Sequence, residues 1–353
     1  MVNPTISKKT EQKLTVTEDA RKLFQIIYRD QNKKVTISDE TPKINVSVMV
    51  SKMAFYYEKI RNSVDYKEEY LLRKNAIQRI LKRQIVIEGA MSMNPKDLDA
   101  NEISQHLLIE LIRAGYLSNN KIPENKISEI GGVIKKYLLL REYWHRAGKG
   151  NRSQHGKKGE EERRGLEKWI IAVAASEIEE NLSANEVDKN VIEQMQRILS
   201  KNISLPAGSP FARDKQTQIN VGIYRNFLKY DRDMLSYILF VDFLPEWADQ
   251  PSDNYISAAA ADIVSWRQKI NFQIDHPLSA QFNRIIAPYT IFFTILVEVI
   301  AEDPRGIYDS LQRDPKAFPR QIKSVYNKRY AAHKSKLWRA AIRSIIYIFL
   351  TKS

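Results

Sequence analysis

A basic, glycine-rich stretch is the part of this sequence closest in form to a phosphate-binding motif. Residues 147–156 read Ala-Gly-Lys-Gly-Asn-Arg-Ser-Gln-His-Gly. A P-loop has four residues between its first glycine and a Gly-Lys pair, then Ser or Thr, and it follows a β-strand. Here five residues separate Gly150 from Gly156, Lys158 replaces the hydroxyl residue, and the preceding segment has helical character. We therefore expect a mobile, solvated loop and no nucleotide site. The alternative is a loop whose bases make secondary contacts with anions: Arg146, Lys149, Arg152, Lys157 and Lys158.

Glu142 and His145 have the Glu-x-x-His spacing that places two metal ligands on one helix face. A di-iron bundle needs a second such pair and two more carboxylates. None of the other four histidines has a glutamate three residues before it, so we interpret this pair as chance. Neither His-Glu-x-x-His nor Gly-x-Ser-x-Gly occurs, which removes support for the common zinc-protease and serine-hydrolase arrangements.

No acid, base and nucleophile can be assigned together, so we expect a non-enzymatic protein without catalytic residues, metal or other cofactor. A helical enzyme with an unrecognised site is the more distant alternative. The chain has no cysteine, which excludes disulfide and thiolate chemistry and is typical of a reducing cytosol. The N-terminus has no apolar core of a secretory signal, and we expect a cytoplasmic location.

The most apolar segment runs from Ile285 to Ala301 and contains one carboxylate, Glu298. It is 17 residues long with Pro288 near its start, whereas a bilayer-spanning helix needs about 20 residues. We interpret it as a buried core helix. In such a helix Glu298 needs a partner, a shifted pKa or a route to the surface.

The last 41 residues, 313–353, carry most of the net charge. They hold eleven Lys and Arg against one acid, Asp314, which is +10 of the chain's +14. In the last predicted helix, bases at i, i+3 and i+7 share one face, and aromatic and aliphatic residues occupy the opposite side. The residues expected to bind a membrane or another anionic surface are Lys334, Lys336, Trp338, Arg339, Ile342 and Arg343.

This pattern predicts an interfacial helix whose bases meet lipid phosphates while its apolar side enters the acyl boundary. Each base near an anionic leaflet contributes about 1 kcal/mol. The apolar end, residues 344–350, reads like the start of a membrane segment, so we expect the cytosolic part of a longer, membrane-anchored protein at the cytoplasmic face of a membrane. Packing of the apolar side on the protein's own core is a nearly equal interpretation.

Nucleic-acid binding, to RNA or single-stranded DNA, is the main alternative function. It would use the same bases with Tyr326, Tyr330 and Trp338 as stacking groups. A pI near 9.6 also allows an acidic protein partner. Six acids and no base lie between Asp233 and Trp266. They indicate a solvated outer face or, alternatively, a docking surface for the basic tail.

The elements that must position these residues are helical. Glycine and proline are scarce and apolar residues recur with a 3.6-residue period, so we predict an all-α multi-helix bundle. Capping boxes at Thr15–Glu18, Asp99–Glu102 and Ser183–Glu186 mark helix starts, and Gly115 marks a stop. The stretch Ile44–Val50 fits strand or helix, and the length of its apolar stripe favours helix. Further helices are expected over 66–86, 219–228, 234–243, 255–272 and 285–301.

The irregular stretch divides the chain into two helical subdomains. The predicted limits are 1–146 for the N-terminal helical domain, 147–160 for the basic flexible loop, 161–312 for the C-terminal helical domain and 313–353 for the basic amphipathic C-terminal helix.

Overall fold

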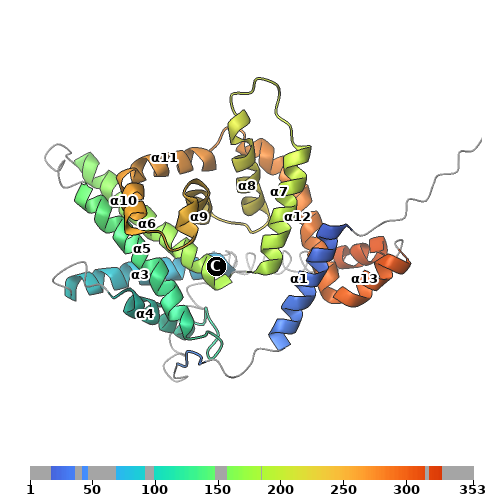
Figure 1. Cartoon of the computed structure of the whole chain (residues 1–353), viewed down its shortest axis with the longest axis horizontal. Coiled ribbons are helices and arrows are strands. Elements are labelled where there is room, and N and C mark those ends of the chain that lie inside the picture. Colours follow the sequence, from blue (N-terminus) through green and yellow to red (C-terminus); the bar gives the residue numbers. More distant parts are fainter. Residues whose placement is uncertain are drawn as a thin grey trace, which may run out of the picture. The chain divides into compact units, whose positions relative to one another are not determined.

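The computed structural model describes residues 17–35, 42–46, 69–91, 99–147, 157–183, 185–314 and 318–327. Within these ranges the chain is a succession of helices (Figure 1). The α-helices are α1 (Glu18–Val35), α3 (Glu69–Met91), α4 (Ala100–Arg113), α5 (Asn125–Ala147), α6 (Lys157–Ser183), α7 (Glu186–Asn202), α8 (Lys215–Asn226), α9 (Arg232–Phe243), α10 (Asp253–Ala261), α11 (Ile263–Ile274), α12 (Ser279–Glu302) and α13 (Pro304–Arg313). Short 3₁₀ helices are η3 (Ala212–Asp214) and η4 (Pro245–Ala248), and residues 318–327 are also helical.

The prediction of an all-α fold is confirmed. Among the described residues, β-structure is confined to one isolated antiparallel bridge between Lys43 and Pro123. Around it, the Ile44 amide donates to the Ile122 carbonyl at 2.9 Å. The interpretation of Ile44–Val50 as helix is therefore wrong for its described part, which ends at Val46. The alternating apolar residues of this part belong to a non-helical segment that lies against the turn before α5.

The helix starts predicted from the three capping boxes agree with the structure to different degrees. Asp99 caps α4 as expected, and its carboxylate accepts from the Asn101 amide at 2.8 Å. The first helix begins at Glu18, and the hydroxyl of Thr17 accepts from the Ala20 amide at 3.3 Å; Thr15 of the predicted capping box lies outside the described residues. The third capping box is wrong: Ser183 ends α6, where its hydroxyl donates to the Glu179 carbonyl at 2.7 Å.

Two other boundaries differ from the prediction. The helix expected over 255–272 is two helices, α10 and α11, which meet at Asp262. Part of the stretch expected as a flexible loop, 147–160, is helical, because α5 continues to Ala147 and α6 begins at Lys157. Gly115 does end α4, with the positive φ of 78° that glycine adopts without strain.

The chain forms two compact units. The larger comprises Ser38–Asn185 and Ile198–Ala287, and the smaller comprises Met1–Ile37, Glu186–Arg197 and Pro288–Ser353. Both units are discontinuous in sequence, whereas contiguous domains are predicted from the sequence. The helices that flank the glycine-rich stretch, α5 and α6, belong to the same unit. The predicted domain limits stay a prediction.

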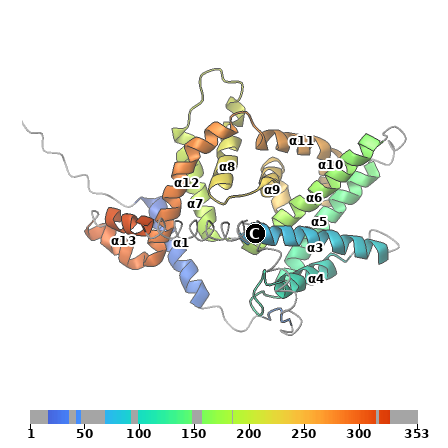
Figure 2. The same cartoon turned by 180° about the vertical axis from the view of Figure 1, so that it is seen from behind.

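The larger unit is built around α6. Every residue of α6 from Ala172 to Glu179 is buried, as expected for a helix enclosed on all sides. Helices α3, α5 and α9 pack against α6, while α4 and α10 pack against α5. The pairing of α5 with α6 is visible from both sides (Figure 1, Figure 2). Two carboxylates of α6, Glu177 and Glu179, are buried within this enclosure, and a third, Glu180, is partly buried.

The smaller unit is organised around α1. Leu23, Phe24 and Ile27 form its buried stripe, as the sequence predicted. The ring of Phe24 meets that of Tyr308 on α13 edge to face, with centroids 5.4 Å apart. On another side of α1, Asp19 accepts an ion pair from Arg197 of α7 at 2.8 Å.

Candidate functional site

The residues expected to bind an anionic surface lie outside the described part of the chain. This holds for Lys334, Lys336, Trp338, Arg339, Ile342 and Arg343, and for Lys149 and Arg152 of the glycine-rich stretch. Lys157 and Lys158 open α6, but their side chains are not described. Their expected roles remain predictions.

Arg146 is described, and it lies in the last turn of α5. Its guanidinium pairs with Glu142 one turn earlier and lies 6.0 Å from the Tyr143 ring centroid. His145 places Nε2 3.1 Å from an oxygen of Glu167 on α6. The Glu-x-x-His spacing thus serves two separate ion contacts, and the described residues contain no group of three or more potential metal ligands.

The described beginning of the basic C-terminal stretch shows how its bases are oriented. In the helix 318–327, Arg320 and Lys323 are exposed and Val325 is buried. Tyr326 is 50% exposed and follows Lys323 by three residues, on the same side of the helix. The stretch therefore begins with a face that combines two bases and an aromatic ring.

Helix α12 is not the wholly buried core helix that the sequence suggested. It has 24 residues and is long and apolar enough to cross a membrane, yet only 33% of its apolar window is buried. In its part within the smaller unit, Ile291 and Phe292 are 56% and 52% exposed. Glu298, the carboxylate singled out in the sequence, is half-buried. Neither packing nor charge explains why these apolar side chains of the helix are exposed.

The strongest assembly of titratable groups in the described chain lies at Glu177 on α6. Its carboxylate accepts from Lys136 Nζ at 2.5 Å and from the Tyr137 hydroxyl at 2.8 Å. Lys136 also donates to the Trp247 carbonyl at 2.7 Å. All four residues are buried. The cluster joins α5, α6 and η4 inside the larger unit.

Burial raises the pKa of the Glu177 carboxyl, and the charge of Lys136 opposes that rise. Burial and the neighbouring Glu177 also raise the pKa of the Tyr137 hydroxyl. The indole N–H of Trp247 is close enough to lower both pKa values, but it does not reach the geometry of a hydrogen bond. Because each charged group already has a partner, this cluster fixes three helices in place and is not built to act on a ligand.

The neighbouring carboxylates of α6 have the same function. Glu179 receives both a 2.8 Å and a 2.6 Å hydrogen bond from Arg73 of α3, a bidentate pair. Burial raises the pKa of Glu179, and Arg73 opposes the rise. Glu180 accepts from the hydroxyl of Tyr230. Three carboxylates of one helix thus hold three different parts of the larger unit.

Among the described residues of this unit, Lys74 on α3 is the most deeply buried base. Its Nζ lies 2.7 Å from Asp231 and 2.8 Å from Asp233, at the start of α9. Asp233 was counted with the acidic run as part of an outer face, but it serves this ion pair. The other acids of the run, Asp242, Glu246, Asp249, Asp253 and Asp262, are exposed, in agreement with a solvated face.

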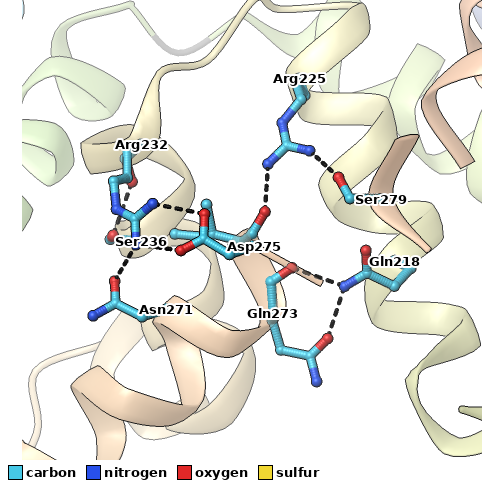
Figure 3. Close-up of polar contacts among 9 residues, drawn as sticks. Gln218, Arg225, Arg232, Ser236, Asn271, Gln273, Asp275 and Ser279 are labelled. Atoms are coloured by element: carbon cyan, nitrogen blue, oxygen red, sulfur yellow. Dashed lines mark hydrogen bonds and ion pairs between the residues drawn. The ribbon is translucent and has the colours of Figure 1, made fainter. Parts of the chain in front are cut away.

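A second polar network holds the turn between α11 and α12 (Figure 3). Arg232 makes a bidentate ion pair with Asp275, with both distances 2.8 Å, and its third hydrogen bond goes to Asn271. Arg225 of α8 donates to the Ile274 carbonyl at 2.9 Å and to the Ser279 hydroxyl. The contact with Ile274 satisfies a backbone carbonyl at the end of α11, where carbonyls have no helical partner.

Gln218 and Asp214 extend this network into the core. Gln218 donates to the side-chain oxygen of Gln273 at 2.8 Å, and Gln273 donates to Asp214 at 2.6 Å. The buried His276 accepts from the Leu278 amide through Nδ1 at 3.2 Å. Its Nε2 is 3.4 Å from Asp214 without the geometry of a hydrogen bond. The imidazole is thus used to form the turn.

Sequence reasoning missed all of these clusters. The run Ser-Glu-Ile-Glu-Glu-Asn at 176–181, inside an apolar helical segment, was the available signal for the α6 carboxylates. Comparison with known proteins adds no assignment: no family model, curated protein or solved structure is significantly similar to this chain. Function must therefore be inferred from the residues themselves.

Proposed function

We propose that this protein attaches to an anionic membrane surface through its basic C-terminal stretch. The observation that carries the proposal is the orientation of the helix 318–327, where Arg320 and Lys323 face solvent while Val325 faces inward. Bases that are already exposed can approach lipid phosphates without breaking contacts in the protein. Among the described residues, neither Arg320 nor Lys323 forms an ion pair with a carboxylate.

Aromatic and aliphatic exposure in the same unit supports a lipid partner. Tyr326 stands beside the two bases, and Tyr is favoured at the boundary between headgroups and acyl chains. Helix α12 adds the exposed Ile291 and Phe292. Contiguous patches of exposed apolar side chains commonly mark an interaction site or a membrane contact, and these two residues are adjacent in the sequence. A bilayer surface supplies both kinds of partner, phosphate and hydrocarbon.

The sequence beyond residue 327 would extend this surface. Seven further Lys and Arg follow, and no acid accompanies them. At about 1 kcal/mol for each base near an anionic leaflet, a few contacts are sufficient for stable attachment. The contribution of charge falls with added salt, whereas that of apolar burial persists.

Substitutions of described residues separate the contribution of charge to binding from that of apolar burial. The variant R320Q/K323Q should lose about 2 kcal/mol of binding to anionic vesicles at low salt, roughly thirtyfold in partition coefficient. The variant F292S/Y326S should bind more weakly at both low and high salt. A matched control is K121Q/K135Q, which removes the same charge from two exposed lysines of the larger unit.

Equal losses in R320Q/K323Q and in K121Q/K135Q would contradict the proposal, because net charge alone would then govern binding. All four substituted side chains of the two test variants are at least half exposed or at the surface. Unchanged thermal unfolding should therefore accompany the change in vesicle binding.

A further inference from the structure

His276, at the turn between α11 and α12, differs from the other histidines whose side chains the structure describes. His106 is exposed and His145 is half-buried, whereas His276 is only 3% exposed. Histidine is the side chain whose charge ordinarily changes between about pH 5 and 8. A buried imidazole inside a hydrogen-bonded turn therefore links that turn to pH, and the membrane attachment proposed above makes no use of it.

One ring nitrogen of His276 holds the turn. Nδ1 accepts a hydrogen bond from the Leu278 amide at 3.2 Å. A ring nitrogen that accepts carries no proton, so the proton of the neutral imidazole is on Nε2. The contact joins a side chain to the amide two residues on, as Asn and Asp side chains do in tight turns. Because α12 begins at the next residue, Ser279, the neutral ring fixes the backbone that leads into this helix.

The other ring nitrogen faces a carboxylate. Nε2 lies 3.4 Å from Oδ2 of Asp214, and it has no hydrogen-bond partner among the described residues. The second oxygen of Asp214, Oδ1, accepts from Gln273 at 2.6 Å. The rings of Phe211 and Phe272 meet the imidazole edge to face, with centroids 4.9 Å and 5.4 Å away. The Nε2–H is thus a buried donor beside an oxygen that Gln273 does not engage.

The other charged groups of the helices around this turn are engaged elsewhere. Asp275 pairs with Arg232 on α9, and Arg225 on α8 donates to the turn backbone and to a hydroxyl of α12 (Figure 3). Lys215 donates to a backbone carbonyl of α7. The first turn of α12 contains no charged residue. Within the described part of the chain, Asp214 is therefore the charge that acts most directly on the ring.

We propose that His276 is a pH-sensitive switch of the turn between α11 and α12. Protonation of the ring places a proton on Nδ1, so that two donors face each other and the hydrogen bond with the Leu278 amide is lost. The charged ring is attracted to Asp214, and its Nε2–H donates to that carboxylate. Protonation thus moves the hydrogen bond of the imidazole from the residue before α12 to Asp214, the residue before α8.

NMR of the intact protein between about pH 5 and 8 would test the switch. The nitrogen shifts of the ring report its tautomer and its protonation, and hydrogen exchange reports the protection of the Leu278 amide. We expect the neutral ring to be the Nε2–H tautomer. As the ring is protonated, the protection factor of the Leu278 amide should fall about tenfold with the same midpoint, because one hydrogen bond is lost.

Three variants separate the imidazole from other titrating groups. H276N keeps an acceptor for the Leu278 amide but cannot be protonated, so the protection of this amide should no longer respond to pH. D214N keeps an acceptor for Gln273 but removes the charge, so its ring should be protonated at lower pH than in the parent protein. The matched control H106N replaces an exposed histidine and should respond as the parent protein does.

A pH response of the Leu278 amide that persists in H276N would overturn the proposal, because another group would then cause it. A neutral ring that carries its proton on Nδ1 would overturn it too, as would an imidazole that stays neutral until the protein unfolds. These last two readouts come from the parent protein, so they decide the question even if H276N does not fold.

Discussion

Replacement of Lys136 by methionine should strongly destabilise the larger unit. Methionine keeps most of the volume of the buried side chain but removes the cation that is 2.5 Å from Glu177 and 2.7 Å from the Trp247 carbonyl. Glu177 then remains buried with the Tyr137 hydroxyl as its described partner. Removal of one partner from a buried ion pair costs about 3–5 kcal/mol, because the other charge is left uncompensated.

The pH dependence of this loss follows from the pKa of Glu177. Burial raises that pKa above its ordinary value of 4.5, so the folded state binds an extra proton between the unfolded and the folded pKa. The contribution of Glu177 to stability therefore falls as pH rises through that window and stays low above it. Without Lys136 the folded pKa should rise further, which adds about 1.4 kcal/mol of loss per pKa unit at neutral pH.

Urea unfolding at several pH values, followed by tryptophan fluorescence, would measure this effect. Trp144, Trp169, Trp247 and Trp266 all report on the larger unit. The matched control is K135M, the same substitution at the neighbouring exposed lysine, which should change stability little. A loss below about 1 kcal/mol for K136M at neutral pH, or the same loss in acid, would refute the view that Lys136 compensates a buried charge.

The further predictions concern the glycine-rich segment 148–158, two glycines within helices, and the ion pair between Arg232 and Asp275. Trypsin should first cut the native protein in the glycine-rich segment 148–158, and protection there would show that this segment is packed. The G222A variant should lose about 1–3 kcal/mol in thermal unfolding, because its Cβ would lie 2.4 Å from a buried isoleucine methyl. By contrast, G132A should gain up to about 1 kcal/mol, since nothing lies within 4 Å of its Cβ, and a loss there would contradict the packing described. Arg232 lowers the pKa of the Asp275 carboxyl. In R232Q, an NMR titration of the carboxyl groups should therefore show a higher pKa for Asp275. In the parent protein, the small contribution of this pair to the free energy of unfolding should disappear as the pH falls through the lowered pKa.

Much of the fold could be predicted from local patterns. The apolar stripe of α1 and the Asp99 cap of α4 depend on residues within two turns of one another, which the sequence displays directly. Boundaries were less predictable. Ser183 has two possible uses, a cap for the following helix or a bond to the carbonyl four residues back, and it takes the second. Asp262 interrupts what reads as one continuous periodic segment.

The polar clusters could not be predicted because their partners are distant in sequence. Glu177 lies 40 residues from Tyr137, and Glu179 lies 106 residues from Arg73. Periodicity places a carboxylate on a helix face but does not name the helix that covers it.

The central claim, attachment to an anionic surface, is tested most directly by flotation of the intact protein with vesicles. We predict binding to vesicles that contain phosphatidylglycerol and none to neutral phosphatidylcholine vesicles, with partial retention when salt screens the charges. Absence from the anionic vesicles at low salt would contradict the proposal. If the same protein instead shifted single-stranded RNA with a steep dependence on salt, nucleic-acid binding would replace membrane attachment as its function.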